Sequence, residues 1–208
     1  MIQFPASRPA LIAYVTCGDP DLSATRDIVL AAIDAGADLV ELGVPFSDPV
    51  ADGPVIQRAS ERALRKGVTL RHVLQLATAI RRRSNAGLIL FSYFNPVLQY
   101  GLERFAAASA DAGLDGALIT DLTVEEASEY LRHMRARQLA TVFLAAPTST
   151  DARLRAIARA STGFVYAVSR TGVTGTRKQL AGDARSLVRR LRRLTRLPIA
   201  LGFGISTP

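Results

Sequence analysis

The chain has 208 residues, of which 49% are apolar and 21% are charged, as in an ordinary soluble globular protein. This composition excludes a disordered tail, a collagen-like fibre and a disulfide scaffold, and no run of about 18 apolar residues is present to span a membrane. The single cysteine, Cys17, cannot form a disulfide within the chain, so we expect a cytoplasmic protein.

The net charge of +8 allows two interpretations, nucleic-acid binding or solvated helix faces. In residues 186–196, Leu187, Leu191 and Leu194 form one apolar stripe, while the intervening arginines face away from it. Since no aromatic-rich strand typical of an RNA-binding surface accompanies these arginines, we predict solvated faces and no nucleic-acid partner.

Short apolar and β-branched runs alternate with amphipathic stretches along the chain. The runs predict strands at residues 10–16, 38–43, 88–92, 116–120, 141–145, 163–168 and 198–202. Start signals predict helices that begin at Ser23, Pro54, Thr69, Leu102, Thr123, Asp151 and Asp183. Thr123 and Glu126 have the spacing of a capping box, and Gly36, Gly67 and Gly113 follow predicted helix ends.

Strands that are apolar almost throughout and separated by helices predict a parallel sheet that is buried on both faces. Seven such units favour an α/β fold of the TIM (β/α)8-barrel type over a doubly wound sheet, because no GxGxxG motif follows the first strand. We expect one domain over residues 1–208 with seven of eight βα units. Either the sequence is a fragment or the eighth unit comes from elsewhere, and we favour a fragment.

The predicted strand 38–43 contains a candidate catalytic carboxylate. Alternation places Leu39, Glu41 and Gly43 on one face of the strand, and Val40 and Leu42 on the other. A carboxylate in an apolar barrel mouth has a raised pKa, the property of a general acid near neutral pH. The alternative is a buried Glu41 that is satisfied by a neighbouring hydroxyl or arginine, and the cost of burial favours the catalytic role.

The loop after this strand, residues 45–54, contains Asp48, Asp52 and three prolines. The prolines stiffen the loop and could hold both carboxylates over the barrel mouth. Equally, Asp52 could cap the helix that begins at Gly53-Pro54. The spacing does not decide between these two interpretations.

Glycines in residues 169–178 and 202–204 follow the last two predicted strands, where this fold often binds phosphate. We expect no metal site. His72 and His133 lie on polar helix faces, and no cluster has the spacing of metal ligands.

These residues belong to longer motifs that resemble the alpha subunit of tryptophan synthase. The motifs are YVTCGDP (14–20), VELGVPFSDPVADGP (40–54), FSYFNP (91–96), ITDL (119–122), YAVSRTGVTG (166–175) and GFGIS (202–206). The resemblance implies retro-aldol cleavage of indole-3-glycerol phosphate, a step of tryptophan biosynthesis, with no cofactor in this subunit. It implies that Glu41 is the catalytic acid/base and that Asp52 stabilises charge at the indole nitrogen.

The resemblance also implies roles for other residues. Thr174 matches the lid threonine, Gly175 and Gly204 match phosphate-binding positions, and Tyr166 and Phe203 match residues at the substrate. Tyr14, Leu118 and Leu144 are expected to line the indole pocket.

Asp48, Asn95 and Pro96 match segments that dock against the beta subunit, the pyridoxal-phosphate-bearing partner in an α2β2 complex. Alternatives to this function are a stand-alone lyase that releases indole, or a non-catalytic chain that only docks the beta subunit. Compared with the family, the N-terminal helix is largely absent before Ala10, the eighth unit is absent, and Thr123 replaces the usual proline.

Overall fold

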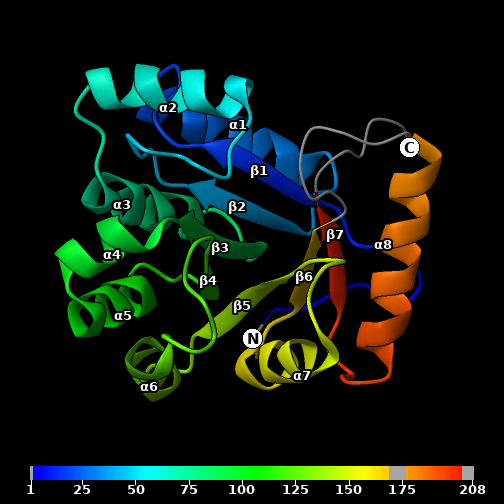
Figure 1. Cartoon of the computed structure of the whole chain (residues 1–208). Helices are drawn as coiled ribbons and strands as arrows, with labels where there is room; N and C mark the ends of the chain where they lie inside the picture. Colours follow the sequence, from blue (N-terminus) through cyan, green and yellow to red (C-terminus); the bar gives the residue numbers. More distant parts are fainter. Residues whose placement is uncertain (1, 169–176, 203–208) are drawn as a thin grey trace. The chain divides into compact units, whose positions relative to one another are not determined.

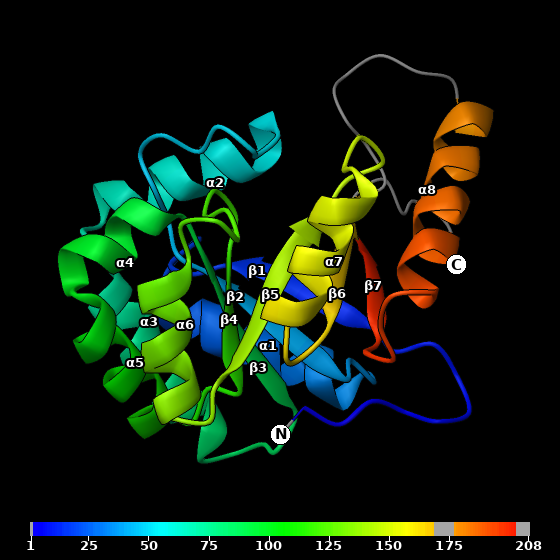
Figure 2. The same cartoon turned by 60° about the horizontal axis from the view of Figure 1, so that its bottom comes forward.

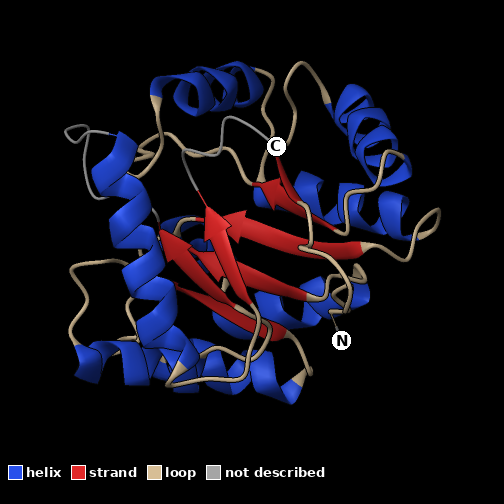
Figure 3. Ribbon diagram, turned by 90° about the vertical axis from the view of Figure 1, so that its right-hand side faces the viewer, coloured by secondary structure: helices blue, strands red, loops and turns tan. Residues whose placement is uncertain are grey.

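A computed structural model describes residues 2–168 and 177–202 (Figure 1), and within helix α8 the side chains from residue 183 onward. Strands and helices alternate in this part of the chain, and each strand from β1 to β6 is followed by at least one helix (Figure 3). The strands are β1 (Ile12–Thr16), β2 (Leu39–Gly43), β3 (Gly87–Ser92), β4 (Gly116–Ile119), β5 (Ala140–Ala145), β6 (Val165–Val168) and β7 (Ile199–Gly202). All seven predicted strands are therefore confirmed, with ends that differ by at most two residues.

The helices are α1 (Leu22–Asp34), α2 (Pro54–Arg65), α3 (Leu70–Arg81), α4 (Phe94–Tyr100), α5 (Leu102–Asp111), α6 (Ser128–Ala136), α7 (Asp151–Ala160) and α8 (Arg177–Arg192). Pro54 occupies the first turn of α2 after Gly53, and Thr69 is the N-cap of α3, as predicted. In addition, His72 completes a capping box with Thr69, which was not predicted. Gly36, Gly67 and Gly113 follow helix ends with positive φ angles, a conformation that glycine adopts at little cost.

Several predicted helix starts are wrong. Helix α1 is capped by Asp21, not Ser23, because the Asp21 carboxylate accepts the Ala24 N–H at 2.8 Å. The motif of Thr123 and Glu126 closes a turn in which the Glu126 N–H donates to the Thr123 carbonyl, and α6 begins later. Helix α8 begins at Arg177, six residues before the predicted Asp183.

Helix α4 was not predicted. It has only seven residues, too few for an apolar period, and Pro96 stands in its first turn, where a missing N–H is tolerated. Gly101, with a φ of 91°, separates it from α5.

The chain divides into two compact units. The first contains residues 2–122 and 128–140, in which β1, β2, β3 and β4 pair in parallel and in this order. Helices α3, α4, α5 and α6 lie side by side along the outside of these strands (Figure 2). The core contains side chains with no exposed surface, among them Leu42, Leu88, Leu90, Ile80 and Phe105.

The register of the first unit determines which side chains share a face of the sheet. Tyr14, Glu41 and Ile89 are paired across β1, β2 and β3. Because side chains at paired positions of parallel strands point the same way, these three residues lie on one face. Val40 and Leu42 lie on the opposite face, as the alternation predicted, and both are fully buried.

In its described part, the second unit contains residues 123–127, 141–168 and 177–202, and its strands β5, β6 and β7 are also parallel. Helix α8 packs against β6, β7 and α7. Leu187 and Leu191 are buried and Leu194 is half-buried, in agreement with the predicted stripe.

Arg190 is an exception to the predicted solvated face of α8. Its guanidinium binds the Asp151 carboxylate at 2.7 Å and the Ser149 carbonyl at 2.6 Å, so it fixes the start of α7. None of the helices within residues 2–168 and 177–202 is long and apolar enough to cross a membrane.

Candidate active site

Glu41 lies in the middle of β2 and is almost completely buried, with 2% of its surface exposed. Burial raises the pKa of its carboxyl group to about 8. Its Oε1 atom has no hydrogen-bond partner within residues 2–168 and 177–202. No hydroxyl or arginine of the described residues therefore forms a hydrogen bond with Oε1, as the alternative interpretation of Glu41 would require. Glu41 has the environment of a protonated acid at neutral pH.

Tyr14 lies beside Glu41 because the two residues are paired in register across β1 and β2. Its ring meets Phe91 edge to face, with 5.1 Å between the ring centroids, and its hydroxyl accepts a long hydrogen bond from Thr16. Burial chiefly raises the pKa of Tyr14, and the nearby carboxylates of Asp52 and Glu41 raise it further. Tyr14 is thus within electrostatic range of both candidate catalytic residues.

Asp52 follows β2 in the loop of residues 44–53. The residue that caps α2 is Gly53, without a side-chain hydrogen bond, so the interpretation of Asp52 as a helix cap is wrong. Instead, the Tyr93 hydroxyl donates to Asp52 Oδ2 at 3.2 Å. Burial raises the pKa of the half-buried Asp52, and the hydrogen bond from Tyr93 opposes this effect.

The backbone of Asp52 is also held. Its N–H donates to the Pro49 carbonyl at 3.1 Å, and its carbonyl accepts from the Gln57 side-chain amide at 2.9 Å. Because Gln57 lies in the first turn of α2, Asp52 is bonded to the preceding loop through its N–H and to the following helix through its carbonyl.

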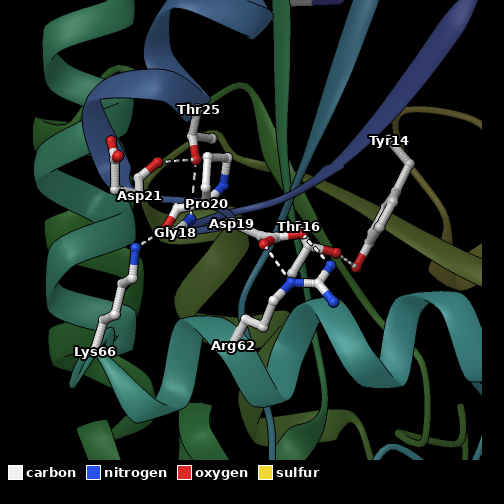
Figure 4. A network of polar contacts seen from close by, with 9 residues as sticks. All are labelled: Tyr14, Thr16, Gly18, Asp19, Pro20, Asp21, Thr25, Arg62 and Lys66. Carbon is white, nitrogen blue, oxygen red and sulfur yellow. Dashed lines mark hydrogen bonds and ion pairs between the residues drawn. The ribbon is translucent and has the colours of Figure 1, made fainter.

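Helix α2 is in turn tied to the loop between β1 and α1 (Figure 4). Arg62 donates to both carboxylate oxygens of Asp19, at 2.8 and 2.7 Å, and the Lys66 ammonium group donates to the Pro20 carbonyl. Within the loop, the Gly18 N–H donates to the buried Thr25 hydroxyl at 3.0 Å. These bonds fix the position of the helix that begins directly after Asp52 and the β1 strand that carries Tyr14.

The other predicted substrate residues fall into two groups. In the first unit, Leu118 is fully buried in β4 and paired with Phe91. In the second unit, Leu144 and Tyr166 are paired across β5 and β6 and therefore share a face. Thr174, Gly175, Phe203 and Gly204 lie outside the described residues.

The predicted docking residues lie on exposed segments of the first unit. Asp48 and Asn95 are exposed, and Pro96 is half-buried in α4. The two segments also expose apolar side chains: Val50 is 85% exposed and Leu98 is 50% exposed. Within the described residues, no group of three or more His, Cys, Asp or Glu side chains is arranged to hold a metal ion.

Sequence reasoning missed Tyr93, the residue that binds the Asp52 carboxylate. Tyr93 stands directly after β3, at the carboxyl end of a strand, where barrel enzymes place functional side chains. That position, within the FSYFNP motif, was the available signal.

Parallel βα units, with the buried Glu41 within β2 and Asp52 in the loop that follows it, are the arrangement of a (β/α)-barrel enzyme. The family model "Tryptophan synthase alpha chain" matches residues 4–208. The chain belongs to this family of lyases of tryptophan biosynthesis, and it carries seven of the strands of the (β/α)8-barrel fold in its described part.

Individual relatives agree with this assignment. The alpha chain of Solibacter usitatus is 57% identical over 97% of this chain and 76% of the relative, and that of Geobacter sulfurreducens is 48% identical over the same shares. The tryptophan synthase α2β2 complex of Pyrococcus furiosus matches 95% of this chain and 79% of the solved chain, at 42% identity and a TM-score of 0.87. Tryptophan synthase of Mycobacterium tuberculosis matches 95% of this chain and 76% of the solved chain, at 42% identity and a TM-score of 0.88.

Proposed function

We propose that this chain cleaves indole-3-glycerol phosphate to indole and glyceraldehyde 3-phosphate, with Glu41 as the acid/base and Asp52 as the carboxylate that faces the indole nitrogen. The observation that carries this proposal is the buried Glu41, whose Oε1 has no partner in the described part of the chain and whose pKa is raised to about 8. A buried carboxyl group that is protonated at neutral pH is suited to donate a proton to a carbon atom of the substrate.

The reaction needs two proton transfers at one carboxyl group. Protonated Glu41 first donates its proton to C3 of the indole ring, which places a positive charge on the ring nitrogen. The resulting Glu41 carboxylate then removes the proton from the hydroxyl group on the adjacent glycerol carbon. The bond between this carbon and C3 breaks, its electron pair returns to the ring, and indole and the aldehyde are formed with Glu41 protonated again.

Asp52 has the complementary role because it is less buried than Glu41 and accepts a hydrogen bond from Tyr93. Hydrogen bonding favours the ionised form of a carboxylate. An ionised Asp52 can accept the indole N–H and stabilise the charge that develops on the nitrogen. The two carboxyl groups have different environments and thus different roles: Glu41 transfers protons, and Asp52 stabilises the positive charge.

The remaining positions have roles that follow from their match to the family. By that match, the residues on the indole side of the substrate are Tyr14, Leu118, Leu144, Tyr166 and Phe203. Gly175 and Gly204 bind its phosphate through backbone N–H groups, and Thr174 orients Asp52 when the lid closes. The proposed domain organisation is a single (β/α)8-barrel domain over residues 1–208, with seven of the eight βα units.

The proposed partner is a tryptophan synthase beta chain, in an α2β2 complex as in the Pyrococcus furiosus relative. Asp48, Asn95 and Pro96 are the proposed docking residues, and the exposed Val50 and Leu98 give the same segments apolar surface. The cleavage needs no cofactor, and pyridoxal phosphate belongs to the beta chain. A cytoplasmic location is compatible with the single free, buried Cys17.

The test is indole release from indole-3-glycerol phosphate by the wild-type chain, Glu41→Gln and Asp52→Asn, each with and without a beta chain. Glu61→Gln, an exposed site on α2, is the matched control. We expect both site variants to lose about 100-fold or more in rate while Glu61→Gln keeps the wild-type rate. A wild-type rate for Glu41→Gln would contradict the proposed acid.

The same assay separates the two alternatives. Full activity without a beta chain would favour a stand-alone lyase. Binding of the beta chain without indole release by the wild-type chain would favour a docking module. We expect release that increases when the beta chain is added.

A further inference from the structure

We propose that Tyr93 is a positioning residue for the cleavage reaction: its hydroxyl fixes the Asp52 carboxylate and the backbone just before it, so that one carboxylate oxygen stays available to the indole N–H. This inference rests on the proposed function, because it concerns the residue that is proposed to stabilise the indole nitrogen.

The Tyr93 hydroxyl is both a hydrogen-bond donor and a hydrogen-bond acceptor. It donates its one hydrogen to Asp52 Oδ2 at 3.2 Å and accepts the Ala51 N–H at 2.9 Å. A phenol hydroxyl has one hydrogen to donate, so the backbone bond leaves that hydrogen for the carboxylate. The pair of bonds therefore orients the hydroxyl toward Asp52 and holds the two consecutive loop residues together.

Tyr93 is itself held rigidly. Its side chain is 3% exposed, and its ring lies 5.1 Å from the Phe46 ring, which belongs to the same loop as Asp52. On one side of Tyr93, the Ser92 hydroxyl donates to the Tyr93 carbonyl at 3.0 Å. On the other side, the Phe94 N–H donates to the Asp121 carboxylate at 2.6 Å, which fixes the start of α4.

The two oxygens of Asp52 are consequently not equivalent. Within the described part of the chain, Oδ2 accepts the hydrogen bond from Tyr93, while Oδ1 has no hydrogen bond to another side chain. A carboxylate that is anchored through one oxygen presents the other in a fixed direction, and this reduces the loss of freedom when the substrate binds. Burial raises the pKa of Asp52, and the hydrogen bond from Tyr93 opposes this rise because it favours the ionised form of the carboxylate.

The direct test is Tyr93→Phe, which keeps the ring beside Phe46 and removes only the hydroxyl. Measured in the complex with a beta chain, we expect kcat to fall about tenfold or more, as for loss of a hydrogen bond to a charged group, with a smaller change in KM. We also expect the acidic limb of the kcat profile to move to higher pH, because Asp52 loses the bond that favours its ionised form. A variant with the wild-type kcat and acidic limb would overturn the proposal.

The matched control is Tyr130→Phe, which removes another buried tyrosine hydroxyl, one that donates to the Ala117 carbonyl at 3.3 Å. We expect this control to lower the melting temperature without moving the acidic limb. A loss of activity in Tyr93→Phe that follows only from lower stability would appear equally in the control and would overturn the positioning role.

A second variant keeps the hydroxyl and strengthens it as a donor. Replacement of Tyr93 by 3-fluorotyrosine is expected to move the acidic limb to lower pH, opposite to Tyr93→Phe. An unmoved limb would count against the proposal even where Tyr93→Phe fails to fold.

Asp52→Asn and the double variant Asp52→Asn/Tyr93→Phe distinguish the proposed role of Asp52 in the reaction from the proposed positioning role of Tyr93. If the double variant is no slower than Asp52→Asn alone, Tyr93 acts through Asp52, as proposed. If Asp52→Asn keeps the wild-type rate, the proposed function of Asp52 fails. If Asp52→Asn is slow while Tyr93→Phe behaves as wild type, only the positioning role fails.

Discussion

The ring of Tyr14 lies directly over Gly43, so that a β-carbon at Gly43 would come within 3.0 Å of the tyrosine hydroxyl. Tyr14 in β1 is paired with Glu41 in β2, and Gly43 lies two residues after Glu41 in β2. The ring therefore leans toward the carboxyl end of β2 and covers the strand just beyond the buried carboxyl group. Tyr166 and Gly202 repeat this arrangement in the second unit, where Tyr166 is paired with Ala200.

The first prediction concerns this contact. In Gly43→Ala the new methyl group would clash with the Tyr14 ring, which must then rotate away from its place beside Glu41. We expect kcat/KM for indole release to fall about tenfold or more, since a small displacement at a catalytic site has a large effect. Gly53→Ala is the control, because a β-carbon there meets nothing within 4 Å. Equal activity of the two alanine variants would contradict the account of Tyr14.

The second prediction concerns stability and pH. The pKa of Glu41 is about 8 in the folded chain, against an ordinary value of 4.5, so the unfolded chain gives up this proton first as the pH rises. The free energy of unfolding is therefore undiminished by Glu41 below about pH 4.5 and decreases as the pH rises to about 8, where the folded chain loses the proton as well. Glu41→Gln removes the penalty and should be more stable than the wild type by about 3 kcal/mol at pH 7. Thermal unfolding from pH 5 to pH 9 measures this difference.

Glu61→Gln is the control for this experiment as well, since Glu61 is exposed on α2. We expect its stability to follow the wild type across the whole pH range. A Glu41→Gln variant that is less stable than the wild type at pH 8 would show that the buried carboxylate is stabilised in its charged form.

The third prediction concerns Arg81 at the end of α3. Its guanidinium donates to the Asp115 carboxylate and to three backbone carbonyls, those of Ser84, Ala86 and Gly113. Arg81→Lys keeps the charge but cannot reach these acceptors at once, so we expect a loss of about 1 to 3 kcal/mol in the free energy of unfolding. Arg82→Lys, at an exposed neighbouring position, should cost almost nothing. Denaturant unfolding of both variants is the measurement, and equal stabilities would exclude this role.

Local patterns were sufficient to predict the strands and the orientation of Glu41. Each strand is a short apolar run. The two-residue period of a strand predicted Glu41 on one face of β2 and Val40 and Leu42 on the other face, and the structure confirms this. Helix starts were less predictable, because Asp21 and Ser23 are both good capping residues and only the geometry selects one.

The surroundings of Asp52 could not be predicted from its own segment. Its carboxylate is bound by Tyr93, which lies 41 positions further along the chain, and no local pattern encodes such a pair. Arg190 shows the same limit: its helix face predicted solvation, whereas its partners lie around Asp151 at the start of α7. Long-range polar contacts of this kind depend on how the elements pack and not on periodicity.

The role of Glu41 as a protonated acid is tested by the pH dependence of indole release by the wild-type chain in complex with a beta chain. Initial rates of indole-3-glycerol phosphate cleavage would be measured from pH 6 to pH 10. We predict a rate that declines on the basic side with an apparent pKa near 8, as Glu41 loses its proton. A rate that stays constant or rises through pH 9 would contradict the assignment of Glu41 as the acid.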